Sequence, residues 1–108
     1  MMNFQKMMKQ AQEMQFKLQE VQEKLKDIEV QGEAGGGLVK ITMTCDGKVR
    51  KVEIDESLMN SDKETLEDLI AAAINNVSEA KDGKVEEETK TMMTELGLPA
   101  EAVSDWPL

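Results

Sequence analysis

The chain has 108 residues, an apolar content of 40% with two Phe, one Trp and no Tyr, and a formal net charge of −9. A single small domain with such an aliphatic and methionine-based core buries little surface, so burial between subunits is expected. The absence of histidine excludes Ser-His-Asp triads, zinc sites of mixed ligands and a histidine general base. One cysteine, Cys45, forms no internal disulfide, and no signal peptide or apolar run of transmembrane length appears, which predicts a soluble cytoplasmic protein.

The acidity belongs to the second half of the chain. Residues 1–54 hold nine Lys or Arg against eight Asp or Glu, whereas residues 55–108 hold four against fourteen. Within the first eighteen residues three lysines stand against one acid: Lys6, Lys9 and Lys17 against Glu13. The start of the chain is therefore locally positive, which is also what an ordinary solvated helix face shows.

The first predicted element rests on an apolar ladder whose gaps alternate between three and four residues. Its members are Phe4, Met7, Ala11, Met14, Leu18, Val21, Leu25 and Ile28. This spacing predicts a long helix with one narrow stripe that faces a partner helix. The ladder stops before a run that contains Gly32 and Gly35–Gly37, and these glycines are predicted to form a turn.

Two strands are predicted next, at Leu38–Thr44 and Val49–Ile54, because apolar and polar residues alternate in both. Asp46-Gly47 between them suits the positive φ of a tight hairpin turn. The segment Ile28–Gly32 fits either a further strand or the last turn of the first helix, so the sheet has two or three strands.

A second long helix is predicted from Ser61 or Asp62 to about Glu95, because either residue can cap the first turn. Its apolar stripe, predicted to be buried, comprises Leu66, Leu69, Ile70, Ala73, Ile74, Val77 and Ala80. Gly83 is expected to introduce a bend or weak point, and Gly97 is expected to end the helix.

No pattern in the chain predicts catalysis. Cys45 has no nearby base, and the glycine run lacks the Lys-Ser/Thr pair of a phosphate-binding loop. Acidic clusters such as Glu86–Glu88 are interpreted as solvated surface. We therefore expect a non-enzymatic protein with no cofactor, no metal and no small-molecule substrate.

Several segments resemble the YbaB/EbfC family of nucleoid-associated proteins over about nine tenths of the chain. They are Lys9–Gln15, the run from Gly32 to Ile41, Val52–Asp55 and the run from Asp62 to Asn75. The resemblance implies an α+β fold of helix, sheet with β-hairpin and helix, in one domain over residues 1–99. The remaining residues 100–108, which carry Trp106, are expected to form a flexible tail. It also implies a tweezer-like homodimer that binds double-stranded DNA in the bacterial cytoplasm, at the nucleoid.

The resemblance further suggests which residues carry these roles. Phosphate contacts are expected from lysines of the two helices: Lys6, Lys9, Lys17, Lys24, Lys81 and Lys84. Neither helix carries an arginine, so any sequence preference is expected to be weak. A partner chain is expected to lie along the ladder and the sheet edge, against Met14, Leu18, Val21, Leu25, Val39, Ile41, Val52 and Ile54.

Two expectations bear on whether an acidic chain binds DNA. A hairpin between the helices is predicted to bring Glu86–Glu88 near Lys6 and Lys9, where they partly cancel the positive charge. The alternative function is a prefoldin-like helical dimer that grips other proteins through apolar and methionine side chains. Salt separates the two hypotheses, because phosphate binding weakens steeply as salt rises and apolar binding does not.

Overall fold

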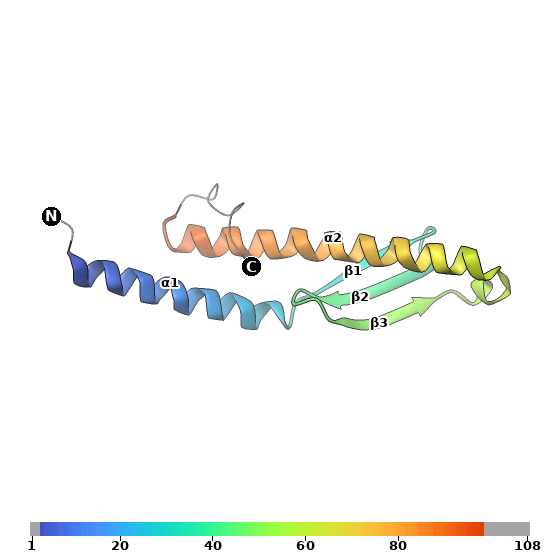
Figure 1. The fold of residues 1–108 in the computed structure, drawn as a ribbon, viewed down its shortest axis with the longest axis horizontal. Coiled ribbons are helices and arrows are strands. Elements are labelled where there is room, and N and C mark those ends of the chain that lie inside the picture. The colour runs from blue at the N-terminus through green and yellow to red at the C-terminus, as the bar shows by residue number, and fades with distance from the viewer. Residues whose placement is uncertain (1–2, 99–108) are drawn as a thin grey trace.

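The computed structural model describes residues 3–98 and contains two long helices joined by a small sheet (Figure 1). In chain order the elements are α1 (Phe4–Leu25), β1 (Glu29–Ala34), β2 (Val39–Thr44), β3 (Val49–Ile54), the 3₁₀ helix η1 (Glu56–Asn60) and α2 (Lys63–Glu95). The molecule is extended, measuring 71 × 22 × 17 Å. The predicted α+β class is confirmed, and the predicted tail with Trp106 lies outside the described residues.

Helix α1 ends earlier than the apolar ladder predicts. Asn3 caps its start, because the Asn3 side chain accepts a hydrogen bond from the Gln5 amide at 3.1 Å. The helix stops at Leu25, so Ile28 lies outside it, although Ile28 still packs on the cluster that contains Leu25. The ambiguous segment after the helix is a strand, β1, and the sheet therefore has three strands.

The sheet is antiparallel, with the order β1-β2-β3. The predicted turn at Asp46-Gly47 is present, and Gly47 adopts a φ of +90°. Gly35–Gly37 also have positive φ and connect β1 to β2, as expected of a glycine turn. Gly32 does not belong to this turn: it lies within β1, where the lack of a Cβ lets α2 approach closely.

Helix α2 covers one face of β1 and β2 but leaves β3 open (Figure 1). Val39 and Ile41 of β2 are buried against Ala73 and Val77 of α2 in the main core. The Asn76 side chain donates a hydrogen bond to the Glu33 carbonyl at 2.7 Å and ties α2 to β1. All six residues of β3 are exposed, so this strand forms an uncovered edge of the sheet.

A second core lies between α1 and the last turns of α2. It contains Val21, Leu25, Cys45, Met92 and Met93, all buried. Helix α2 runs unbroken through Gly83, so the helical hydrogen bonding is not interrupted there.

Helix α2 ends at a glycine in the left-handed conformation, as many helices do. Gly97 has a φ of +74°, its amide donates to the Thr94 carbonyl at 3.0 Å, and the Leu98 amide donates to the Met93 carbonyl at 2.9 Å. These two bonds form a Schellman motif, which satisfies carbonyls that the helix leaves free. The predicted stop at Gly97 is confirmed.

Candidate functional site

The two helices run antiparallel, and the first half of α1 extends beyond the C-terminal end of α2 (Figure 1). Lys24 of α1 lies opposite Glu88, and Lys17 lies opposite Glu95, the last residue of α2. We call the projecting part of α1, Phe4–Glu13, the tip. Among the described residues, nothing on α2 faces Lys6 closely enough to form an ion pair.

The six lysines that were expected to contact DNA fall into two groups. Lys6 and Lys9 on the tip are exposed and form no ion pair with any residue between Asn3 and Leu98. The other four form ion pairs with acidic side chains: Lys17, Lys24, Lys81 and Lys84. Of these six lysines, only the two on the tip therefore carry a charge that no ion pair within the described part of the chain matches.

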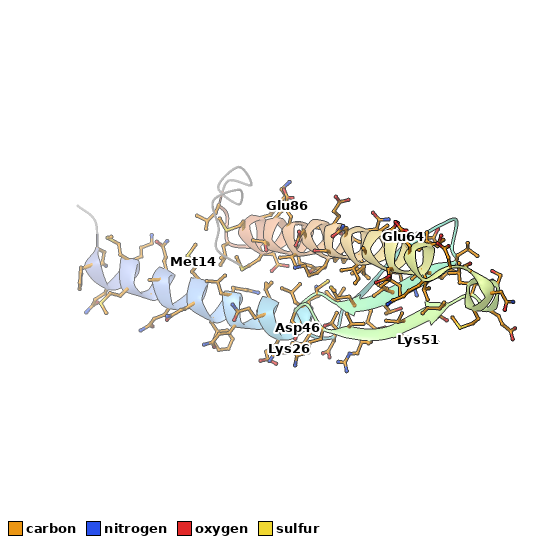
Figure 2. All side chains as sticks on the ribbon, turned by 45° about the vertical axis from the view of Figure 1, so that its right-hand side comes forward. Met14, Lys26, Asp46, Lys51, Glu64 and Glu86 are labelled. Atoms are coloured by element: carbon orange, nitrogen blue, oxygen red, sulfur yellow. The ribbon has the colours of Figure 1, made fainter. Side chains whose placement is uncertain are left out.

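The expected cancellation of Lys6 and Lys9 by Glu86–Glu88 is wrong. Glu86 pairs instead with Lys90 at 3.1 Å and lies on the outer side of α2 (Figure 2). Glu88 pairs with Lys24 at 2.9 Å, several turns from the tip. These glutamates lie far from Lys6 because α1 projects past the end of α2 instead of ending level with it.

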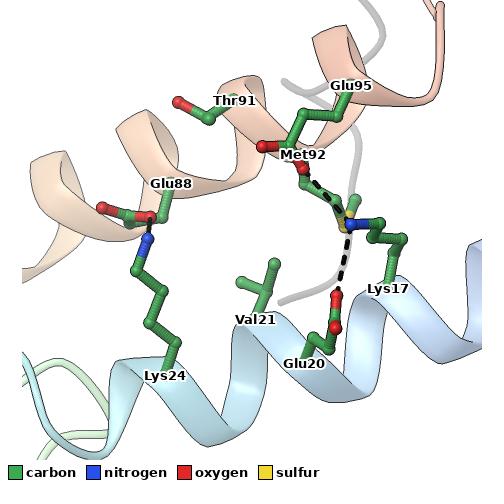
Figure 3. Close-up of a pocket in the computed structure, with 8 residues that line it drawn as sticks. All are labelled: Lys17, Glu20, Val21, Lys24, Glu88, Thr91, Met92 and Glu95. Carbon is green, nitrogen blue, oxygen red and sulfur yellow. Dashed lines mark hydrogen bonds and ion pairs between the residues drawn. The ribbon is translucent and has the colours of Figure 1, made fainter.

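A groove between α1 and the end of α2 holds two of the four paired lysines (Figure 3). Its cavity measures about 380 Å³, with Lys17 and Lys24 along the α1 wall and Glu88 and Glu95 along the α2 wall. Lys17 Nζ lies 3.5 Å from Glu95 Oε2 and 3.3 Å from Glu20 Oε2.

Glu88 is the most enclosed carboxylate of the groove. Only 14% of its side chain is exposed, and its second oxygen lies 3.7 Å from Lys84 Nζ. The hydrogen bond from Lys24 lowers the pKa of Glu88, and the same contact raises the pKa of Lys24. Sequence reasoning missed the pairings of Glu88 and Glu95, because heptad spacing does not give the axial register of two helices.

The residues expected at a dimer interface differ in how deeply they are buried within one chain. Val21, Leu25, Val39 and Ile41 are already buried within this one chain. Met14 and Leu18 are partly covered by the second core, and Figure 2 shows Met14 projecting from α1 toward α2. The remaining two, Val52 and Ile54, are exposed by 48% and 37%.

Further apolar side chains are exposed besides those eight residues. Val49 lies on β3 opposite Met43, and Ile74, which was expected in the buried stripe of α2, is 45% exposed. Phe4 and Phe16 on α1 are 73% and 65% exposed. The available signal was the alternation of Val52 and Ile54 with charged residues, but it does not show whether this chain or another covers them. Val49 falls outside this alternation and pairs with Met43 through a register shift in the sheet.

Among residues 3–98, no cluster of His, Cys, Asp and Glu has the arrangement of a metal site. In the same part of the chain, neither helix carries an apolar stretch that could cross a bilayer. Cys45 is buried, and burial raises the pKa of its thiol, which disfavours the reactive thiolate.

A protein-family model, the YbaB/EbfC DNA-binding family, matches residues 1–96. The chain belongs to this family. Its fold also matches a crystal structure of the uncharacterized protein HP0035 from Helicobacter pylori, with a TM-score of 0.74 and 25% sequence identity. That match covers 86% of this chain and 99% of the other. The family to which this YbaB/EbfC member belongs is a DNA-binding family.

Proposed function

We propose that this protein is a non-enzymatic, nucleoid-associated homodimer that binds double-stranded DNA through phosphate contacts made first by the tip of α1. Membership of the YbaB/EbfC DNA-binding family supports the ligand. The observation that carries the location is the exposed, unpaired state of Lys6 and Lys9 within the described residues. A homodimer would present two such tips.

The start of the tip lies away from the acidic side chains of α2. Lys9 and Lys6 lie eight and eleven residues before Lys17, the first α1 residue that an α2 carboxylate reaches. At 1.5 Å per residue these separations are about 12 and 17 Å along the helix. The Debye length is about 8 Å at physiological salt, so the α2 carboxylates are largely screened from Lys6. Lys9 lies nearer to them, because it lines a cavity that Glu95 also lines.

Contacts from lysine to phosphate hold a protein on DNA without reading the bases. Neither α1 nor α2 contains an arginine, which is the side chain best suited to bidentate guanine recognition. We therefore propose binding with weak sequence preference.

The uncovered apolar side chains of the sheet support the proposed homodimer. In the register of β2 and β3, Val52 lies beside Ile41 and Ile54 lies beside Val39. These β3 side chains are therefore on the same face of the sheet that α2 covers over β1 and β2. That face of β3 is apolar and open, and Ile74 adds an exposed apolar side chain on α2. A second copy that covers these residues would complete the thin core.

The test is fluorescence anisotropy of a labelled duplex at low and near-physiological salt, with Lys6→Ala/Lys9→Ala beside the natural protein. We expect binding that weakens with salt, and a log–log slope that becomes shallower by about 0.9 for each lost phosphate contact. The matched control is Lys48→Ala/Lys63→Ala, which removes two exposed lysines far from the tip and should keep the natural slope. No binding at low salt would refute the DNA role.

A second candidate function is favoured by the apolar side chains on the tip. Phe4, Met7 and Met8 are exposed there, and Phe16 is exposed just behind it. A prefoldin-like protein would use such a surface to hold unfolded chains. Binding of a denatured client that persists as salt rises, with no DNA binding, would select this function.

A further inference from the structure

Lysines along α1 form a row that continues from the tip into the groove. Lys6 and Lys24 are eighteen residues apart, which is five full turns at 3.6 residues per turn, so both lie on the same side of the helix. Lys17 lies on nearly that side, about 20° away. A duplex that contacts Lys6 and follows this side of α1 therefore meets Lys17 and Lys24 next.

Carboxylates of α2 occupy this continuation of the row. Glu88 Oε2 lies 2.9 Å from Lys24 Nζ, and Glu95 Oε2 lies 3.5 Å from Lys17 Nζ (Figure 3). A carboxylate and a phosphate offer lysine the same kind of charge-assisted oxygen acceptor. Either one can therefore fill the same position beside the ammonium group.

The two ion pairs differ in how open they are to solvent. The side chains of Lys17 and Glu95 are 38% and 56% exposed. In the other pair the side chain of Lys24 is 61% exposed and that of Glu88 is 14% exposed, so this pair is open on its lysine side. Exposed pairs contribute little to stability and are screened by salt. Their partners can therefore change without unfolding the helices.

We propose that Lys17 and Lys24 are a second, latent set of phosphate contacts, which Glu95 and Glu88 occupy in the unbound protein. The proposal rests on the proposed DNA function and adds a restraint to it. The tip lysines bind first, and the groove lysines add to binding only when phosphate displaces the two glutamates. The end of α2 thereby limits how much of α1 holds DNA.

The first variant for the test is Glu88→Gln/Glu95→Gln, which removes both α2 charges and keeps the side-chain shapes. Glu20 of α1, 3.3 Å from Lys17 Nζ, is retained, so Lys24 is the lysine that this variant frees most completely. We expect tighter duplex binding, by roughly 5- to 10-fold at about 0.1 M salt for each contact released, and a slope steeper by about 0.9 per contact. Circular dichroism of each variant confirms that the helices are retained.

A matched control separates release of the groove lysines from a simple change in net charge. Asp68→Asn/Glu79→Gln removes two exposed acids of α2 that form no ion pair within residues 3–98. We expect this control to leave the salt slope unchanged. An equal gain in the control and in the groove variant would overturn the proposal.

Adding Lys17→Ala/Lys24→Ala completes a double-mutant cycle. In the natural protein this pair should cost no more affinity than Lys48→Ala/Lys63→Ala, because Glu88 and Glu95 already occupy the groove lysines. In the Glu88→Gln/Glu95→Gln background it should abolish the whole gain. Equal costs in both backgrounds would overturn the latent contacts.

The failure of this proposal differs from the failure of the DNA function. If the natural protein binds and Lys6→Ala/Lys9→Ala weakens it, while the groove variant matches its control, only the latent contacts are refuted. If no variant binds a duplex at low salt, both proposals are refuted.

Discussion

Gly32 of β1 lies directly against the backbone of Val77 in α2. A Cβ placed on Gly32 would stand 2.2 Å from the Val77 amide nitrogen and 2.5 Å from its Cα. Both are backbone atoms in the middle of a long helix, so they cannot move aside as the end of a side chain can. This contact sets how closely α2 packs on the sheet.

Gly32→Ala should therefore destabilise the protein, by about 1–3 kcal/mol or more, since the added methyl group forces α2 away from β1. The free energy of unfolding from urea denaturation measures this loss. Gly36→Ala is a useful comparison, because nothing lies within 4 Å of its Cβ position and only the cost of its positive φ of +67° applies. Unchanged stability in Gly32→Ala would show that the helix and the strand are not held at this distance.

Gly83 presents the opposite case. It lies in the interior of α2, is exposed, and has nothing within 4 Å of its Cβ position. Gly83→Ala should stabilise the protein by about 1 kcal/mol, because alanine loses less backbone entropy in a helix. Thermal unfolding followed by circular dichroism measures the gain, and a lower melting temperature would mean that this position needs the freedom of glycine.

Local chemistry made much of this fold predictable. Asp46-Gly47 determines the tight turn between β2 and β3, and Gly97 determines the end of α2 through its positive φ. Both features depend on a few neighbouring residues. The apolar ladder likewise predicted a helix, although α1 ends at Leu25 because the chain turns at Lys26–Asp27 before it enters β1.

The arrangement between distant segments was not predictable in the same way. The ladder indicates which side of α1 is apolar, but it does not indicate that Lys17 lies opposite Glu95. That register follows from the placement of α2 on the sheet, where Gly32 meets Val77. The expected position of Glu86–Glu88 beside the tip was wrong for this reason, and the division of the lysines into free and paired groups became visible only in the structure.

The open apolar face of β3 predicts how the proposed dimer can be broken. Val52→Lys places a charge among exposed apolar side chains, which a second copy would have to desolvate. We expect the dimer to dissociate at concentrations where the natural protein stays associated, as measured by sedimentation equilibrium. The monomer should remain folded, because Val52 is 48% exposed within one chain.

Gln31→Lys is the control for this experiment. Gln31 lies on β1 in register with Thr42, on the opposite, polar face of the sheet, and the substitution adds the same charge. It should leave the association unchanged. Equal dissociation in both variants would point to a general effect of charge, and a natural protein that is monomeric at all concentrations would contradict the proposed homodimer.

The pair formed by Lys24 and Glu88 predicts how stability depends on pH. The hydrogen bond from Lys24 lowers the pKa of Glu88 in the folded state. The pair therefore stabilises the fold fully above the unfolded-state pKa of a glutamate, about 4.3. This contribution is lost as the pH falls through the lower pKa of folded Glu88. The pKa of Lys24 is raised by the same contact, so the contribution is present below about 10.4 and is lost as the pH rises through the folded value. The pair therefore stabilises the fold between these limits.

Lys24→Gln should raise the pKa of Glu88, because the substitution removes the charged hydrogen-bond donor that favours the carboxylate. A titration of the Glu88 side-chain carbon by NMR measures this value directly. Lys63→Gln, which removes a lysine at the other end of α2, should leave the Glu88 titration unchanged. Since Lys84 also lies 3.7 Å from Glu88, Lys24→Gln/Lys84→Gln should raise the pKa further. The same Glu88 pKa in the natural protein and in all three variants would mean that these lysines do not hold the carboxylate. Glu88 would then be unable to compete with phosphate for Lys24.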